Sequence, residues 1–99
     1  MPDQLAPEFD LDAPWRLHDR VAVRPEPFGA LLYHYGSRRL SFLKSPELLA
    51  VVQALDSQPT ARDACTEAGV PAADLPRYAT ALATLAATDM ILPRQETAG

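Results

Sequence analysis

Between residues 21 and 44, hydrophobic and polar positions alternate in three short runs separated by proline, glycine and serine. A period of two residues is typical of half-buried strands, so we expect strands at residues 21–24, 29–35 and 38–44. Pro25 and Pro27 end the first run, because proline has no N–H for a sheet ladder. Between the other two runs, Gly36 and Ser37 fit the central positions of a two-residue type II′ turn.

That turn fixes a register for the hairpin. The predicted cross-strand pairs are Tyr35 with Arg38, Tyr33 with Leu40 and Leu31 with Phe42. One face then carries most of the large apolar groups. The opposite face carries Leu32, His34, Arg39 and Ser41. One of the two faces must be buried, and the strand at residues 38–44 is left as an edge that can accept another strand.

After residue 44 the hydrophobic period changes from two to about 3.6, which indicates helices. Ser45-Pro46-Glu47 combines a hydroxyl N-cap, a proline in the first turn and an acid at the positive end of the helix dipole, so a helix is expected from there to about Leu55. The core-facing positions of this helix are Leu48, Val51, Val52 and Leu55. Thr60 and Asp63 resemble a capping box that starts a short second helix, which ends near Gly69.

A third helix is expected to begin between Pro71 and Pro76 and to continue to about Asp89. Its apolar stripe consists of Leu75, Tyr78, Leu82 and Leu85. Many alanines surround the stripe. They either let another backbone approach closely or simply reflect the high helix propensity of alanine, and the sequence gives the two interpretations equal weight. Residues 90–92, followed by Pro93, are compatible with one more short extended segment.

These elements predict an α+β fold: a small winged-helix-like domain in which a three-stranded antiparallel sheet is followed by three helices. A chain of 99 residues forms one domain with a small core. Residues 1–14 hold three prolines and four acids and are expected to be a flexible tail. The folded domain is then expected at residues 15–94, with a second flexible tail at residues 95–99.

Charge is unevenly distributed along the chain. The net charge is −4, but residues 15–44 contain six basic and two acidic side chains, which leaves the rest of the chain strongly acidic. A basic sheet on an acidic body attracts an acidic ligand to the strands and repels it from the helices. A solvated arginine-rich surface without a partner explains the pattern equally well.

Residues for catalysis are not evident. Cys65 is the only cysteine, which excludes a disulfide framework and a thiolate metal cluster and fits a reducing cytoplasm. No apolar run approaches the length of a membrane span, and no secretory signal is evident. Phosphate-binding loops, paired-histidine metal motifs and nucleophile elbows are missing, and His18 and His34 are isolated. We therefore expect a cytoplasmic protein that is not an enzyme and uses no cofactor or metal.

Residues 21–55, VAVRPEPFGALLYHYGSRRLSFLKSPELLAVVQAL, resemble the peptide chaperone family of the mycofactocin system, the MftB-like members of the PqqD-like group of RiPP recognition elements. VRPEPFGALLYH and RRLSFLKS are the most specific strings, and the similarity stays in register to Ile91. It implies a domain that binds the ribosomal mycofactocin precursor peptide and presents it to a radical SAM maturase. By the same resemblance, the maturase oxidatively decarboxylates the C-terminal tyrosine of the peptide and crosslinks it to the neighbouring valine.

The mechanism that fits both the residues and the resemblance is β-augmentation, in which the peptide pairs with the edge strand at residues 38–44 and rests against the third helix. Arg39 and Lys44 would favour acidic peptide residues, and apolar side chains would form the floor. The predicted peptide-binding residues are Arg38, Arg39, Leu40, Ser41, Phe42, Leu43, Lys44, Arg77, Tyr78, Ala81, Leu82 and Leu85.

Two alternatives remain open on the residues alone. The order of helices and hairpin also matches a winged helix-turn-helix DNA-binding module. Against this, the third helix offers only Arg77 for phosphate contacts, beside Asp74 and Asp89. The second alternative is a structural module that dimerises through its own edge strand. We expect the precursor peptide and the maturase as partners, no nucleic acid or membrane, and a monomer or weak dimer.

Overall fold

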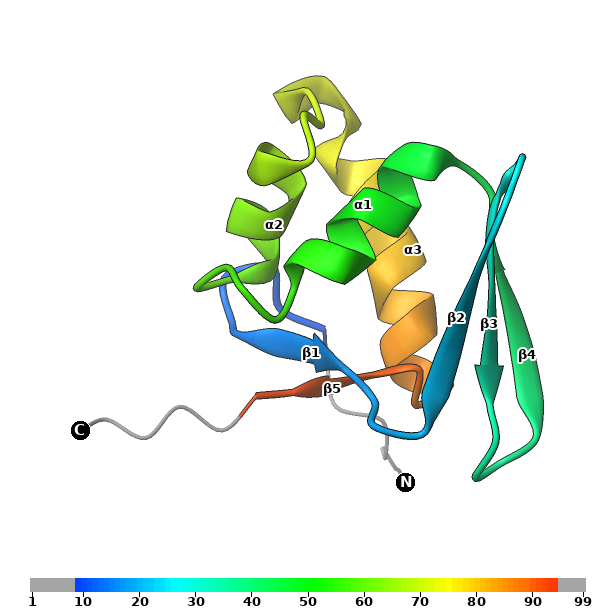
Figure 1. The fold of residues 1–99 in the computed structure, drawn as a ribbon. Coiled ribbons are helices and arrows are strands. Elements are labelled where there is room, and N and C mark those ends of the chain that lie inside the picture. Colours follow the sequence, from blue (N-terminus) through cyan, green and yellow to red (C-terminus); the bar gives the residue numbers. More distant parts are fainter. Residues whose placement is uncertain (1–8, 95–99) are drawn as a thin grey trace.

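The computed structural model describes residues 9–94 and confirms an α+β fold with a three-stranded antiparallel sheet followed by three helices (Figure 1). The elements in chain order are β1 (Trp15–Leu17), β2 (Val21–Glu26), β3 (Gly29–His34), β4 (Arg39–Leu43), α1 (Pro46–Ala54), α2 (Ala61–Glu67), the 3₁₀ segment η1 (Ala72–Asp74), α3 (Leu75–Ala87) and β5 (Ile91–Pro93). Within the described residues, no helix is long and apolar enough to cross a membrane.

Strands β2, β3 and β4 lie in that order, so β4 is an edge strand. The predicted register is confirmed, with Tyr33 opposite Leu40 and Leu31 opposite Phe42. Strand β2 extends past its predicted end and includes Pro25. This is possible because β2 is the other edge of the sheet, where proline is tolerated.

The predicted type II′ turn is wrong. Residues 35–38 form a four-residue loop in which the Arg38 N–H donates to the His34 carbonyl at 2.6 Å. Arg38, with φ 65°, takes the left-handed conformation, and Gly36 has no positive φ. The imidazole of His34 organises the loop instead, since its Nδ1 accepts the N–H groups of Gly36 at 3.1 Å and Ser37 at 3.0 Å. A Cβ atom on Gly36 would lie 2.9 Å from the His34 ring, which is why glycine is needed there.

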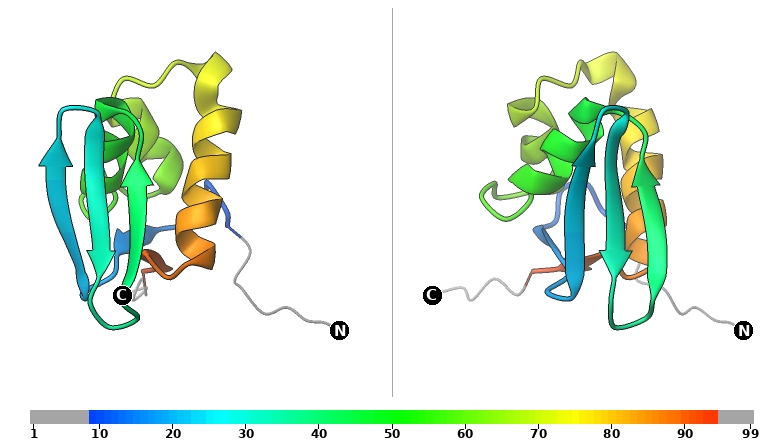
Figure 2. Two further views of the ribbon diagram at one scale, coloured as in Figure 1. Left: turned by 90° about the vertical axis from the view of Figure 1, so that its right-hand side faces the viewer. Right: turned by 45° about the vertical axis from the view of Figure 1, so that its right-hand side comes forward.

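The face with the large apolar groups is not the buried face of the sheet. The inner face, which packs on the helices, carries Val21, Ala30, Leu32, His34 and Leu43, all buried. Glycine is required at the start of β3, because Gly29 (φ +150°) lies so close to the end of β4 that a Cβ would overlap the Leu43 carbonyl. The outer face carries exposed side chains, including Tyr33 and Phe42, and no described element lies in front of it (Figure 2).

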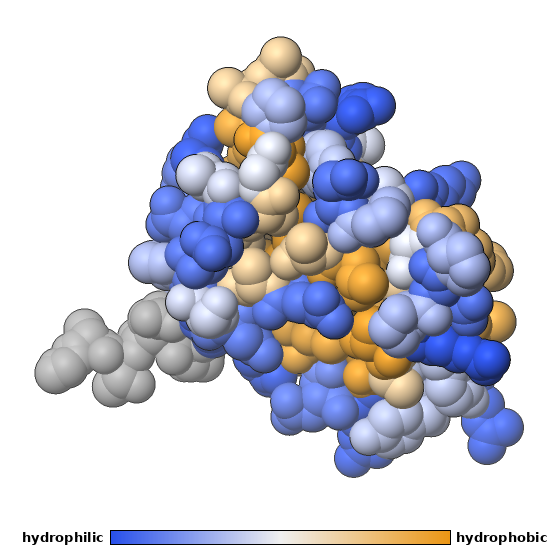
Figure 3. All heavy atoms as spheres, turned by 45° about the horizontal axis from the view of Figure 1, so that its top comes forward, coloured by the Kyte–Doolittle hydropathy of each residue, from blue (hydrophilic) through white to orange (hydrophobic). Residues whose placement is uncertain are grey.

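The helix starts are as predicted. The Ser45 hydroxyl accepts the Leu48 N–H at 3.1 Å, and the Thr60 hydroxyl accepts the Asp63 N–H at 3.1 Å. The core lies between the sheet and the helices and contains the apolar stripe of α1 together with Leu82 and Leu85 of α3. Apolar side chains also reach the surface between the helices and at the right-hand margin of the molecule, where the sheet lies (Figure 3).

A second sheet, which we did not predict, joins the two ends of the domain. Strand β1 pairs antiparallel with β5, so that Trp15 faces Pro93. The part of the expected N-terminal tail that is described, residues 9–14, contacts the domain: the Phe9 ring lies 4.8 Å from the Trp15 ring, and the Trp15 indole N–H donates to the Asp10 carbonyl at 2.8 Å. Residues 1–8 and 95–99, the rest of the expected tails, lie outside the described residues.

Candidate functional site

A continuous surface groove lies between the edge strand β4 and helix α3. Two adjoining cavities of about 380 and 500 Å³ form it, and both are lined by Lys44, Leu48 and Ala81. The first cavity is also lined by Ser45, Glu47, Arg77 and Tyr78. The second is also lined by Leu40, Ser41, Phe42, Leu43, Thr84 and Leu85. We call the whole depression the β4–α3 groove, and β4 and α3 are its two walls.

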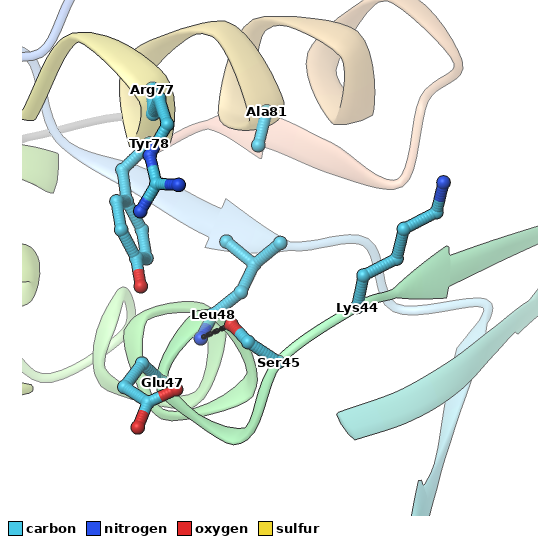
Figure 4. Close-up of a pocket in the computed structure, with 7 residues that line it drawn as sticks. All are labelled: Lys44, Ser45, Glu47, Leu48, Arg77, Tyr78 and Ala81. Atoms are coloured by element: carbon cyan, nitrogen blue, oxygen red, sulfur yellow. Dashed lines mark hydrogen bonds between the residues drawn. The ribbon is translucent and has the colours of Figure 1, made fainter. Parts of the chain in front are cut away.

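The floor of the groove is apolar and already well packed. Leu43 is fully buried, and Leu48 and Leu85 present only small parts of their side chains to solvent, because each of the three is also part of the core. Ala81 projects from α3 over Leu48, and its small side chain keeps the space open (Figure 4). The groove is therefore shallow and smooth, and it suits an extended chain better than a bulky compact ligand.

One end of the groove is basic. Lys44 extends from the end of β4, and Arg77 lies across from it on the first turn of α3 (Figure 4). Arg77 is loosely held, since its guanidinium is 3.8 Å from the Asp74 carboxylate and its side chain is 76% exposed. The positive end of the α3 dipole adds to this charge. Glu47 on the same rim offsets part of it.

The edge of β4 offers unpaired backbone groups at defined positions. The Tyr35 N–H donates to the Arg20 carbonyl at 2.9 Å, so this N–H points toward β2. Because N–H directions alternate along a strand, the N–H of Leu32 points the other way, toward β4, and Leu32 and Ser41 form a hydrogen-bonded pair. The N–H and C=O groups of Leu40 and Phe42 consequently point away from the sheet.

Most of the predicted site residues come together in this groove. Leu40 to Lys44 line it from the strand, and Arg77, Tyr78, Ala81 and Leu85 line it from the helix. Leu82 does not, because it is fully buried on the core side of α3. Arg38 and Arg39 are exposed at the turn end of β4 and do not line the cavities.

Sequence reasoning missed four lining residues: Ser45, Glu47, Leu48 and Thr84. The first three begin α1, and we assigned them only to helix capping and to the core. Thr84 could have been found, because it follows Ala81 by three residues and so lies on the same side of the helix.

His18, His34 and Cys65 have contacts that fit structural roles. The rings of His18 and His34 lie 4.3 Å apart, and the Nδ1 atom of each accepts backbone N–H groups. Burial raises the pKa of the Cys65 thiol, which keeps it protonated. Within residues 9–94, no group of three or more histidine, cysteine or acidic side chains is placed to hold a metal ion.

Comparison with known proteins identifies the family. Residues 14–92 match the peptide chaperone MftB family. The chain is 59% identical over 90 residues to the peptide chaperone MftB of Mycobacterium tuberculosis, an alignment that covers 91% of this chain and 83% of that protein. It is 54% identical over 87 residues to the peptide chaperone MftB of Mycobacterium ulcerans, covering 88% and 80% of the two chains. The corresponding protein of Mycolicibacterium smegmatis is 52% identical over 85 residues, covering 86% and 83%.

No solved structure matches the chain. The family match covers most of the described residues, including both walls of the groove, and the relatives align over most of their own length. The chain belongs to the peptide chaperone MftB family.

Proposed function

We propose that this protein is a non-catalytic chaperone that binds the mycofactocin precursor peptide as an added strand on β4 and delivers it to a radical SAM maturase. The observation that carries the proposal is the combination of outward-facing backbone groups at Leu40 and Phe42 with a shallow apolar groove beside them. The family supports the chaperone role. The identity of the peptide and of the maturase follows from the sequence resemblance.

Strand addition assigns a position to each peptide side chain. Peptide residues opposite Leu40 and Phe42 would exchange main-chain hydrogen bonds with them and would place their side chains on the outer face of the sheet. The peptide residue opposite Ser41 would point to the inner side, toward Ala81 and Leu85 of α3. The groove therefore favours a peptide with an apolar residue at this central position.

The basic side chains near the groove favour acidic residues in the peptide segments that flank its central position. Lys44 and Arg77 line the same cavity from opposite walls of the groove, so acidic peptide residues between them are stabilised. Arg38 and Arg39, outside the groove lining at the turn end, extend the positive field along the strand and add to long-range attraction. Because these contacts are exposed, salt will screen them over a Debye length of about 8 Å at physiological ionic strength.

The maturase, not this chain, would supply the redox chemistry. The iron–sulfur cluster and S-adenosylmethionine would belong to the radical SAM enzyme, and the chaperone would supply peptide recognition. We place both partners in the cytoplasm, where the free Cys65 thiol stays reduced.

No feature of α3 favours a role in DNA recognition. The Thr80, Thr84 and Thr88 hydroxyls donate to carbonyl groups four residues earlier in the chain, at 3.1, 3.1 and 3.0 Å, so they already have hydrogen-bond partners. Arg77 is the only cation of the helix, and Asp74 lies beside it.

Amide hydrogen exchange combined with a peptide titration tests the proposal. In the free protein, the outward amides of Leu40 and Phe42 should exchange quickly, while the Ser41 amide, bonded to β3, should be protected. The precursor peptide should bind with a stoichiometry of one without added metal, nucleotide or thiol, and it should protect Leu40 and Phe42. Binding that protects only α3 amides would contradict strand addition, and no binding at all would contradict the proposed function.

A further inference from the structure

The large hydrophobic side chains that are exposed in the described chain lie together at the outer face of the sheet. Within residues 9–94, the large hydrophobic side chains that are exposed are Phe28, Tyr33, Tyr35, Leu40 and Phe42, from 37% to 58% exposed. All five belong to β3, β4 or the turns at the two ends of β3. We call them the outer patch. Tyr33 lies directly opposite Leu40, and the rings of Phe28 and Phe42 are 6.2 Å apart, so the patch is continuous.

The outer patch has a basic border. Arg24 lies in the same cross-strand row as Leu31 and Phe42, and its side chain is 77% exposed. Arg20 and Arg38 lie near the turn end and are exposed. The neighbouring acids are already paired: Glu26 with Arg24 at 3.0 Å, and Asp19 with Arg16 at 2.9 Å. The pair with Glu26 also offsets the charge of Arg24, but Arg20, Arg24 and Arg38 outnumber the two acids, so the net charge around the patch is positive.

A peptide bound along the edge of β4 covers only the β4 side of this patch. It would reach Leu40 and Phe42, but Tyr33 lies on β3, one strand farther from the edge. A second copy using the same face is disfavoured, because a two-fold contact would bring the arginines of one copy against those of the other. Aromatic and arginine side chains are those enriched at protein interfaces. The charge fits a partner surface with apolar groups bordered by carboxylates.

We propose that the outer patch is the docking surface for the maturase, which approaches the face of the sheet while the peptide occupies the β4–α3 groove. This inference rests on the proposed function and adds to it the surface that binds the maturase and the chemistry of that surface. The edge of β4 borders both sites, so peptide residues opposite Leu40 and Phe42 would lie next to the docked enzyme. The two ligands would therefore bind side by side without competition.

The test uses the full-length protein, the purified radical SAM maturase and the precursor peptide. Tyr33→Thr removes the central ring but keeps a β-branched residue that suits a strand. Arg24→Glu reverses a border charge and leaves the rings in place. Glu67→Lys, an exposed position on α2, is the matched charge control. Binding to immobilised maturase is measured with and without peptide, and peptide binding is measured separately by calorimetry. Circular dichroism and sedimentation velocity report folding and self-association.

We expect Tyr33→Thr to weaken maturase binding by about tenfold or more. Arg24→Glu should mainly slow association and reduce its salt dependence. Both variants should keep native peptide affinity, and Glu67→Lys should behave as the wild type in both assays. If folded Tyr33→Thr and Arg24→Glu bind the maturase as the wild type does, the docking surface lies elsewhere and this inference fails alone. Wild-type protein that binds peptide but not maturase, or that dimerises through the patch, also overturns it. Failure to bind the peptide would contradict the proposed function itself.

Discussion

Proline substitutions at two adjacent positions of β4 should have opposite effects, because the structure assigns opposite N–H directions to Ser41 and Phe42. At Ser41 the N–H points to β3, where its hydrogen-bonded partner Leu32 is fully buried. Ser41→Pro removes that donor and leaves a buried carbonyl unsatisfied, at a cost of about 1–3 kcal/mol. The proline ring also crowds the ladder, so the total loss should be about 3 kcal/mol or more. For a domain of this size, that lowers the melting temperature by at least about 12 °C.

At Phe42 the N–H points outward, so Phe42→Pro breaks no bond within the sheet. The side chain it replaces is 58% exposed, and the loss of unfolding free energy should stay near or below about 1 kcal/mol. Binding should respond strongly, because the variant cannot donate to an added strand and its ring obstructs close approach. A loss of about 1–3 kcal/mol corresponds to roughly a tenfold to hundredfold weaker affinity for the precursor peptide.

Phe42→Ala is the matched control, since it removes the aromatic ring but keeps the N–H. Thermal melts followed by circular dichroism give stability, and calorimetric titration with the precursor peptide gives affinity. The reasoning predicts a stable Phe42→Pro variant with poor binding, a destabilised Ser41→Pro variant, and a Phe42→Ala variant whose affinity lies much nearer the wild type. Native affinity in a folded Phe42→Pro variant would refute strand addition on β4. A melting temperature that falls more for Phe42→Pro than for Ser41→Pro would refute the assigned N–H directions.

Three further predictions concern stability and reactivity. The Arg94 guanidinium donates to the carbonyl groups of Leu55 at 2.6 Å and Gln58 at 3.0 Å. Arg94→Met should therefore lower the free energy of unfolding, measured by urea titration, by about 2 kcal/mol or more, and Arg94→Lys should restore only part of the loss. The hydrogen bond from Arg62 lowers the pKa of Asp12, so this stabilisation is present above the unfolded-state pKa and is lost as the pH falls through the folded-state pKa. Urea midpoints of the wild type and of Asp12→Asn should therefore differ at pH 7 and converge in acid; equal midpoints at pH 7 would contradict a stabilising role. Burial raises the pKa of Cys65, so iodoacetamide at pH 8 should modify the native protein slowly and the urea-unfolded protein quickly, as mass spectrometry can show.

The sequence was sufficient for the strand register but not for the side of the sheet that is buried. Alternation at residues 29–44 separates two sets of side chains, and pairing Tyr33 with Leu40 follows from the position of the turn. The alternation left open which of the two faces is buried. In the structure α1 packs against the β3 face that carries the fully buried Ala30, and the chain between β4 and α1 passes so close to Gly29 that no Cβ fits there. Close approach depends on the positions of both elements, which no local pattern contains.

The candidate site, too, could be predicted from the sequence only in part. The edge strand and the apolar stripe of α3 could be found from periodicity, and the structure brings them together in one groove. Periodicity could not separate Leu82, which points into the core, from Ala81, which lines the groove, because a helix turns by only 100° per residue. The pairing of β1 with β5 was missed because three residues are too few to show a period of two.

The charges beside β4 can serve two purposes at once. An exposed edge strand invites pairing with a second copy, and proteins usually protect such edges by keeping them short and charged. Strand β4 has five residues, with Arg38 before it and Lys44 after it. If two copies paired antiparallel around Ser41, Arg38 of one copy would lie opposite Lys44 of the other, and like charges in that position are destabilising. An acidic peptide on the same edge would instead meet attraction at both ends. The charges that discourage self-pairing would thus select the peptide, and the edge can stay open for it.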